Sequence, residues 1–336
     1  MQRTRSAARA LIALTVATLG LVLAGCSEPP TANEDARLNV VTTVSPITNI
    51  VQNVAGPVVK VTGIVPEGTN SHTFEPAPSD GKLLAGADLV IMNGLHLEEP
   101  TRVLAEKVKK RDVRIVQLGE KAIEPADYAF DFSFPEADGD PNPHLWTDPE
   151  LVARYAEIVR DALIEADSKN ADAYRKNAVA FIVKARAFTK ALHVASATVP
   201  ERKLVTYHDA YAYFARRFGW TVIGAIQPSD FSEPRPRDIA EIIAQIKREK
   251  VRAIFGSEVF PSSVLEQIAK DSGARYVDAL RDDDLPGKNG DPDHSLLGLL
   301  KFDYVTMVEA LGGDASSLKM LDVANIQSGD SFEYRY

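Results

Sequence analysis

Residues 170–199 read NADAYRKNAVAFIVKARAFTKALHVASATV and contain no glycine. Apolar side chains recur along this stretch at steps of four and three residues, the spacing that places them on one face of an α-helix. The positions on this face are Tyr174, Ala178, Phe181, Ala185, Phe188, Leu192 and Ala195. A helix of about 25 residues is roughly 37 Å long. We therefore expect a rigid helix that joins two parts of the fold.

Val179, Ile182 and Val183 make the same helix apolar on a second face. A coiled-coil dimer is an alternative use for such a helix, but the regular spacing lasts only about three heptads. A helix that is apolar on more than one face is better buried within its own chain. We therefore expect both faces to be covered and the protein to be a monomer.

Short β-branched runs alternate with helical patterns on both sides of this helix, as is typical of buried parallel strands. The expected strands are 38–44, 58–65, 88–92 and 114–118 before the helix, and 203–207, 221–226, 252–256 and 275–278 after it. Ser45 is the expected N-cap of the helix that follows the first strand. The pattern predicts two α/β lobes with mostly parallel sheets, at 37–168 and 199–336, joined by one long rigid helix at 169–198.

The composition is that of an ordinary globular protein, with 336 residues of which 45% are hydrophobic and 25% charged. This excludes a disordered chain, a fibre and a disulfide scaffold. The 38 Lys and Arg residues against 47 Asp and Glu residues give a net charge of −9. Because a non-specific nucleic-acid binder needs a cationic surface, no nucleic-acid partner is expected. An acidic surface is compatible with a cationic ligand.

The first 25 residues have the pattern of a secretory signal peptide. Three arginines lie within the first nine residues, and an apolar stretch follows from residue 10 to about 23. A membrane-spanning helix needs about 20 apolar residues, so this stretch is too short to be one. The predicted signal peptide covers residues 1–25.

Cys26 is the only cysteine, and the ending Leu23-Ala24-Gly25-Cys26 resembles a bacterial lipobox. The resemblance implies cleavage before Cys26 and lipidation (palmitate) of its thiol. An ordinary signal peptide in which Cys26 is incidental is the alternative. Residues 26–36 would be a flexible lipidated tether that holds the protein to the outer face of the cytoplasmic membrane. A single cysteine also excludes a Cys-based zinc cluster, so a metal site would need histidines and carboxylates.

Four possible metal ligands lie at or just beyond the end of a predicted strand, or at the start of a helix. They are His72, His144, His208 and Asp278. In open α/β sheets, ligands bind outside the carboxyl ends of the strands. Three imidazoles and one carboxylate would fill a four-coordinate site for a divalent transition metal at about 2.0 to 2.2 Å. Two of these ligands would come from each lobe.

A series of motifs occurs in order along the whole chain. They are the lipobox, Gly68 to Pro76 with Pro78-Ser79-Asp80, Ala87 to Val90 with Asn93-Gly94, Asn142 to Pro149, the long helix, Tyr207 to Phe214, Ile254 to Glu258, and Tyr276 to Asp278. Together they resemble the metal-binding lipoproteins, or solute-binding proteins, of bacterial ABC importers for zinc and manganese. The resemblance implies one metal ion per chain, held in the interlobe cleft and delivered to a membrane permease, with no catalytic activity. It also implies that His72 and His144 are ligands from the N-terminal lobe, and His208 and Asp278 from the C-terminal lobe.

The donor set favours Zn²⁺, because imidazole-rich sites suit zinc and carboxylate-rich sites suit manganese. Some members of the family place Glu where this chain has His208, a difference associated with manganese. Zinc importers often carry a His-rich loop before the second ligand, whereas residues 120–140 here are acidic and contain no histidine. Mn²⁺, or Fe²⁺, is therefore the alternative metal.

Several other polar residues lie near the predicted strand ends or in loops. Glu258 is a candidate for hydrogen bonding to a ligand histidine, or for a charge at a helix N-terminus. Asp282, Asp283 and Asp284 are expected in a solvated loop. His294, in a Gly/Asp-rich loop, is expected at a mobile surface.

Two other classes of protein fit the sequence less well. A zinc hydrolase needs an open coordination position and a general base, and the chain has no His-Glu-x-x-His pair. A siderophore or cobalamin binder could share the rigid helix, but its cleft would need apolar and basic contacts and would have no use for three histidines. An adhesin role is a further alternative for a surface lipoprotein.

Overall fold

The computed structural model describes residues 37–258, 263–327 and 332–334, with the backbone alone at 278–279 and 332–334. The predicted signal peptide, Cys26 and the tether lie outside the described residues. In the described part, no helix is both long and apolar enough to cross a membrane. The chain from Arg37 onward groups as one compact unit.

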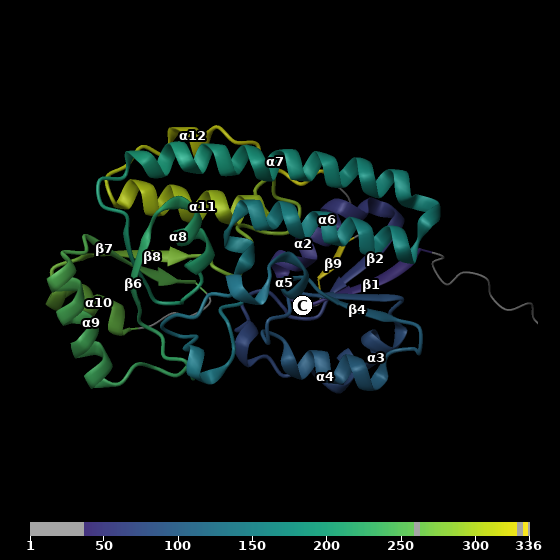
Figure 1. Cartoon of the computed structure of the whole chain (residues 1–336), viewed down its shortest axis with the longest axis horizontal. Helices are drawn as coiled ribbons and strands as arrows, with labels where there is room; N and C mark the ends of the chain where they lie inside the picture. The colour runs from purple at the N-terminus through teal and green to yellow at the C-terminus, as the bar shows by residue number, and fades with distance from the viewer. Residues whose placement is uncertain (1–36, 259–262, 328–331, 335–336) are drawn as a thin grey trace, which may run out of the picture. The chain divides into compact units, whose positions relative to one another are not determined.

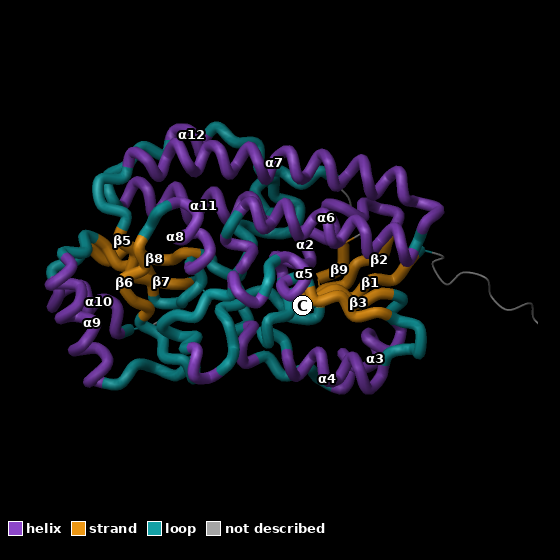
Figure 2. The backbone as a smooth tube through the Cα atoms, viewed as in Figure 1, coloured by secondary structure: helices purple, strands orange, loops and turns teal. Residues whose placement is uncertain are grey.

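Two parallel sheets confirm the predicted α/β fold class (Figures 1 and 2). The first has the strand order β4-β3-β1-β2-β9 and the second the order β6-β5-β7-β8. Strands of the first sheet are β1 (Leu38–Thr42), β2 (Val59–Gly63), β3 (Leu89–Met92), β4 (Arg114–Gln117) and β9 (Phe332–Tyr334). Strands of the second are β5 (Lys203–Thr206), β6 (Thr221–Ala225), β7 (Ala253–Ser257) and β8 (Arg275–Leu280).

The last strand, β9, does not join the sheet of the second lobe, to which the sequence assigned residues 199–336. β9 follows the second lobe in the sequence but pairs with β2 of the first sheet, in the register Val61 with Phe332 and Gly63 with Tyr334. The chain therefore crosses between the sheets a second time near its end. The other predicted boundaries stay predictions.

Helices surround both sheets. Those in the first half of the chain are α2 (Ser45–Ala55), α3 (Pro78–Gly86), α4 (Glu99–Val108), α5 (Gly119–Ala122) and α6 (Pro149–Ala166). The later ones are α7 (Ala171–Thr198), α8 (Ala212–Phe218), α9 (Pro236–Glu249), α10 (Val264–Ser272), α11 (Leu296–Ala310) and α12 (Ser316–Lys319). In Figure 1, α7 runs along one side of the unit above both sheets.

α7 confirms the predicted long helix, with 28 residues and a length of about 42 Å. All seven residues of its predicted apolar face are buried. The expectation that its second apolar face is covered is wrong, because Val179 and Val183 are 59% and 62% exposed. α7 packs against α2, α6, α11 and α12, and these two valines remain on its outer side.

One hydrophobic core extends across both sheets. It contains Val40 and Val61 of the first sheet, Phe188 of α7, Phe255 of β7 and Tyr304 of α11. The opposite face of each sheet has its own smaller core, formed with α3 and α4 in one case and with α9 and α10 in the other. Because the central core is shared, side chains of both lobes hold each other in place.

Replacing a buried apolar residue of α7 by alanine should lower the stability of the protein far more than replacing an exposed one. Phe188→Ala leaves a cavity in the shared core and should lower the free energy of unfolding by about 3–5 kcal/mol. Val183→Ala, on the exposed side, should change it by less than about 0.5 kcal/mol. Urea unfolding followed by circular dichroism measures both, and equal losses would contradict the assignment of the buried face.

Candidate metal centre

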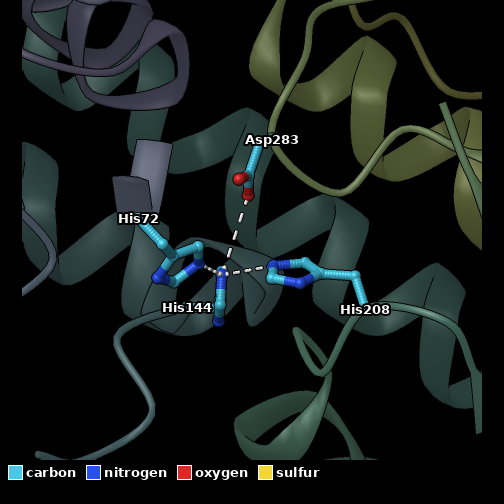
Figure 3. A group of neighbouring side chains, drawn as sticks. All are labelled: His72, His144, His208 and Asp283. Carbon is cyan, nitrogen blue, oxygen red and sulfur yellow. Dashed lines mark hydrogen bonds and ion pairs between the residues drawn. The ribbon is translucent and has the colours of Figure 1, made fainter. Parts of the chain in front are cut away.

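Four side chains from separate parts of the chain meet at the carboxyl ends of the strands. His72 lies in the short 3₁₀ turn Ser71–Thr73 beyond β2, and His144 directly precedes the turn Leu145–Thr147. His208 lies just beyond β5, and Asp283 lies in the loop after β8. Each offers one ligand atom, and these atoms all lie within 4.8 Å of one another (Figure 3).

The three imidazoles point their Nε2 atoms at one another. His144 Nε2 lies 3.1 Å from His72 Nε2 and 2.9 Å from His208 Nε2. Asp283 Oδ1 lies 3.8 Å from His144 Nε2. His144 and His208 are fully buried, and Asp283 is 4% exposed. The sequence therefore identified three of the four members of this cluster.

Buried amides determine which nitrogen of two imidazoles carries the proton. His144 Nδ1 donates to Asn142 Oδ1 at 2.8 Å, and His208 Nδ1 donates to Gln227 Oε1 at 2.8 Å. Because an amide oxygen can only accept, the proton of each neutral ring is on Nδ1. Each Nε2 then presents a lone pair to the centre of the cluster.

Asn142 is itself held in one orientation. Its Nδ2 donates to the backbone oxygen of Asp209 at 2.7 Å and to Asp131 Oδ2 at 3.2 Å. Both partners are acceptors, so the amide cannot turn over without losing them. Asn142 therefore links His144 of the first lobe to the loop that follows His208.

Asp283 completes the cluster with an oxygen that has no hydrogen-bond donor in the described part of the chain. Its Oδ2 accepts from the Ser71 hydroxyl at 3.0 Å, whereas its Oδ1 is buried and unpartnered. A buried carboxylate oxygen without a partner is costly. Three nitrogen lone pairs and this oxygen form a site that a divalent cation would satisfy at all four atoms.

Burial keeps the imidazoles uncharged and disfavours the charged form of the carboxylate. The pKa of His72 and that of His144 are lowered well below the usual value, mainly by desolvation, and the pKa of His208 is lowered to about 4. Desolvation, with the charge of Asp282, raises the pKa of Asp283 well above its usual value. Burial therefore favours the uncharged form of each imidazole and of the Asp283 carboxyl group.

The position of Asp283 corrects one expectation from the sequence. The loop at 282–284 is not solvated at Asp282 and Asp283, which are 1% and 4% exposed. β8 continues to Leu280, two residues beyond the predicted end, so the loop at its carboxyl end begins later. Asp278 lies inside this strand and its side chain lies outside the described part, so its ligand role stays a prediction. The three acidic residues shortly after the end of this strand are the signal that could have pointed to Asp283.

Groups from both lobes hold this loop. Ser45 Oγ donates to the backbone oxygen of Asp283 at 2.8 Å, and Trp146 Nε1 donates to that of Asp282 at 3.0 Å. Ser45 was expected to be the N-cap of α2, but α2 begins at Ser45 and Val44 is in the N-cap position. From the second lobe, the Tyr211 hydroxyl lies 2.7 Å from Asp282 Oδ1. The carboxylate of the cluster is therefore positioned by both halves of the molecule.

The remaining candidates lie elsewhere. Glu258 forms an ion pair with Arg281, at 2.6 Å between Oε2 and Nη1. His96 is exposed, with its Nδ1 3.5 Å from Asp140 Oδ1. His294 was expected at the surface, but it is buried, with its Nε2 3.5 Å from Glu67 Oε1. The imidazoles of His144 and His208 are hydrogen-bonded instead by Asn142 and Gln227. Asn142 lies in a predicted motif and Gln227 directly follows a predicted strand, but nothing in the local sequence pairs either amide with a distant histidine.

Comparison with known proteins agrees with a metal centre. A family model described as the periplasmic component A of the zinc-uptake complex (ZnuA) matches residues 40–310. The manganese-binding lipoprotein MntA of Halalkalibacterium halodurans is 30% identical over 300 residues, which cover 88% of this chain and 96% of that protein. The iron-binding protein YfeA of Yersinia pestis is 27% identical over 307 residues, covering 91% and 96%. The solved structure of the periplasmic zinc-binding protein TroA from Treponema pallidum has a TM-score of 0.74 and 25% identity, covering 82% and 99%.

Metal affinity should rise with pH above the lowered pKa of His208, which is about 4. A cation that binds Asp283 displaces its proton, which the raised pKa of this carboxyl group retains, whereas the lowered pKa values of the imidazoles favour their neutral form. Binding should release about one proton per ion, as calorimetry in buffers of different ionisation enthalpy would measure. In Asp283→Asn the proton release should disappear. Release that persists in this variant would mean that a histidine is the titrating group.

Proposed function

This chain belongs to the family of periplasmic zinc-uptake component A proteins, the extracytoplasmic metal-binding receptors of ABC importers, and we propose that it captures Zn²⁺ and delivers it to the permease. The family consists of transport receptors, and the chain is not an enzyme. The proposed ligands are His72, His144, His208 and Asp283, with one ion per chain.

The observation that carries the proposal is the convergence of three neutral imidazole nitrogens and one carboxylate oxygen within 4.8 Å. Zinc is commonly four-coordinate and accepts nitrogen ligands readily, whereas manganese prefers oxygen ligands and a higher coordination number. With three nitrogens among four donors, the donor set favours zinc. Four protein ligands would also close the site, which suits binding and release rather than chemistry on a metal-bound water.

Mn²⁺ or Fe²⁺ is the second candidate, and the names of relatives are the reason. MntA of H. halodurans is named for manganese and YfeA of Y. pestis for iron, at 30% and 27% identity. A carboxylate that binds through both oxygens, together with water on the side of His72, would raise the coordination number toward the one that manganese prefers. The affinity order of the metals alone does not decide which ion a cell loads.

An organic ligand such as a siderophore or cobalamin has less support. The cavity beside His72 is about 170 Å³, below the roughly 300–1,000 Å³ of sites that enclose drug-sized ligands. Its lining includes acidic side chains, Asp138 and Asp140. We therefore favour a bare or hydrated cation.

For its location, we propose the outer face of the cytoplasmic membrane, with a lipid anchor at Cys26. MntA of H. halodurans is named a lipoprotein, and the lipobox-like ending of the first 26 residues supports the same arrangement for this chain. We also propose that the protein acts as a monomer, since the apolar face of α7 is covered within its own chain.

Two aspartate variants test the ligand assignment. Asp283→Ala should weaken Zn²⁺ binding by more than about 100-fold, beyond the 10–100-fold that loss of a group supporting a ligand causes. Asp278→Ala should leave the affinity unchanged within about threefold. Titration against a competing chelator measures both. The reverse order of effects would restore the assignment made from the sequence.

The metal itself is tested by competition. The purified protein, stripped of metal and offered Zn²⁺ and Mn²⁺ together at buffered free concentrations, should retain one equivalent of zinc that excess manganese does not displace, as quantified by mass spectrometry. Retention of manganese against buffered trace zinc would select the second candidate. The absence of any stoichiometric metal would contradict both.

A further inference from the structure

A cavity reaches the cluster at His72. Among the four cluster residues, His72 alone lines this cavity, which we call the access cavity and which has a volume of about 170 Å³. This volume has room for several water molecules. A cation approaching through it would meet His72 before the other three side chains.

His72 is also the least firmly held of the three imidazoles. His144 and His208 each donate Nδ1–H to a buried amide. In the described part of the chain, the only hydrogen-bonding contact of the His72 ring is Nε2 with His144. The backbone of His72 is fixed, because its N–H donates to Asn70 Oδ1 at 3.0 Å. The ring itself can therefore turn without breaking a hydrogen bond to a supporting group.

Two phenylalanines hold the ring of His72 instead. Phe231 stacks on it, with 4.4 Å between centroids and an interplanar angle of 17°. Phe134 lies 5.6 Å from it at a tilt of 44°. Both phenylalanines line the access cavity, so these apolar rings border the route between the cluster and solvent.

Phe231 occupies an unusual backbone conformation. Its φ is +56°, in the left-handed region that bulky side chains rarely adopt. The residue lies between β6 and α9, and its N–H donates to the backbone oxygen of Pro228 at 3.0 Å. Such strain persists only where surrounding structure enforces it, and it is frequent at ligand clamps and switch regions. Here the strained residue belongs to the second lobe and covers a ligand of the first.

The lining farther from the cluster is acidic. Asp138 and Asp140 line the access cavity, together with His96, and all three are exposed. Carboxylates in a concave surface raise the local concentration of cations and their rate of arrival. The access cavity thus joins an acidic exterior to His72.

We propose that metal ions enter and leave through the access cavity, with His72 as the ligand that swings and Phe231 as the side chain that opens and closes the route. The proposal rests on the proposed function, since it concerns exchange at the same site. In it, His144, His208 and Asp283 keep their positions while the Phe231 ring moves off His72. His72 then turns toward the cavity and carries or releases the ion.

Exchange kinetics test the proposal on the purified full-length protein. Dissociation is measured by stopped-flow transfer of Zn²⁺ to an excess of fluorescent chelator, and association by rapid mixing with buffered Zn²⁺. In Phe231→Ala, both rate constants should rise about tenfold, which corresponds to about 1.4 kcal/mol at the barrier. The equilibrium affinity should change by less than about threefold. Phe231→Trp, with a larger ring, should slow both rates.

Two further variants serve as controls. Phe132→Ala removes an exposed phenylalanine from the loop that carries Phe134 and should change neither rate. Gln227→Leu removes the partner of a fixed ligand, so it should raise the dissociation rate and the dissociation constant together. Its association rate should stay near that of the parent protein.

The outcomes separate the access route from the binding function. Unchanged rates in both Phe231 variants, in a protein that still binds one Zn²⁺, would overturn the access route and leave the proposed function intact. A rise in dissociation rate matched by an equal loss of affinity would also overturn it, because Phe231 would then only support His72. Failure of the parent protein to bind a stoichiometric metal would overturn the proposed function.

Discussion

The arrangement of the molecule depends on three imidazole nitrogens and one carboxylate oxygen that face one another in a buried space. In the state that binds a cation all four atoms are acceptors, so none can satisfy another. Separations of 2.9 and 3.1 Å between the nitrogens are short enough for a single ion to contact them together. Burial lowers the pKa of the imidazoles and raises that of Asp283, so protons compete with the ion more strongly at the carboxylate than at the imidazoles. The rest of the fold holds these four groups close together, although their lone pairs would otherwise repel one another.

Neither lobe could hold them alone. His72 and His144 belong to the first lobe and His208 to the second, and the loop with Asp283 follows β8 but is bonded by Ser45 and Trp146 of the first. Asn142 of the first lobe donates to the backbone of Asp209 in the second. Beneath this seam, one core runs from β1 through α7 to β7 and α11. A shared core and shared hydrogen bonds make the cluster a property of the whole unit.

The three imidazoles are not held equally firmly. This difference relates the binding of the metal ion to its release. Two rings are fixed by buried amides, whereas the third is held by stacking beside a cavity. Fixed ligands reduce the ordering that binding requires and so favour high affinity. A ligand that can move without breaking a hydrogen bond to a supporting group offers a path for exchange. A receptor that must retain an ion and later hand it over needs both properties.

The sequence by itself determined the two α/β lobes, the buried face of α7 and the three histidines, because periodicity and position after a strand are local properties that survive folding. It did not determine the exposure of Val179 and Val183, because which side of an apolar helix is covered depends on how many helices pack against it. It also placed the end of β8 two residues early, which directed attention to Asp278 and left Asp283 in a solvated loop. Only the tertiary structure brings Asp283, Asn142, Gln227 and Phe231 to the histidines, since their contacts join segments far apart in the chain and depend on distances that spacing along the sequence does not encode.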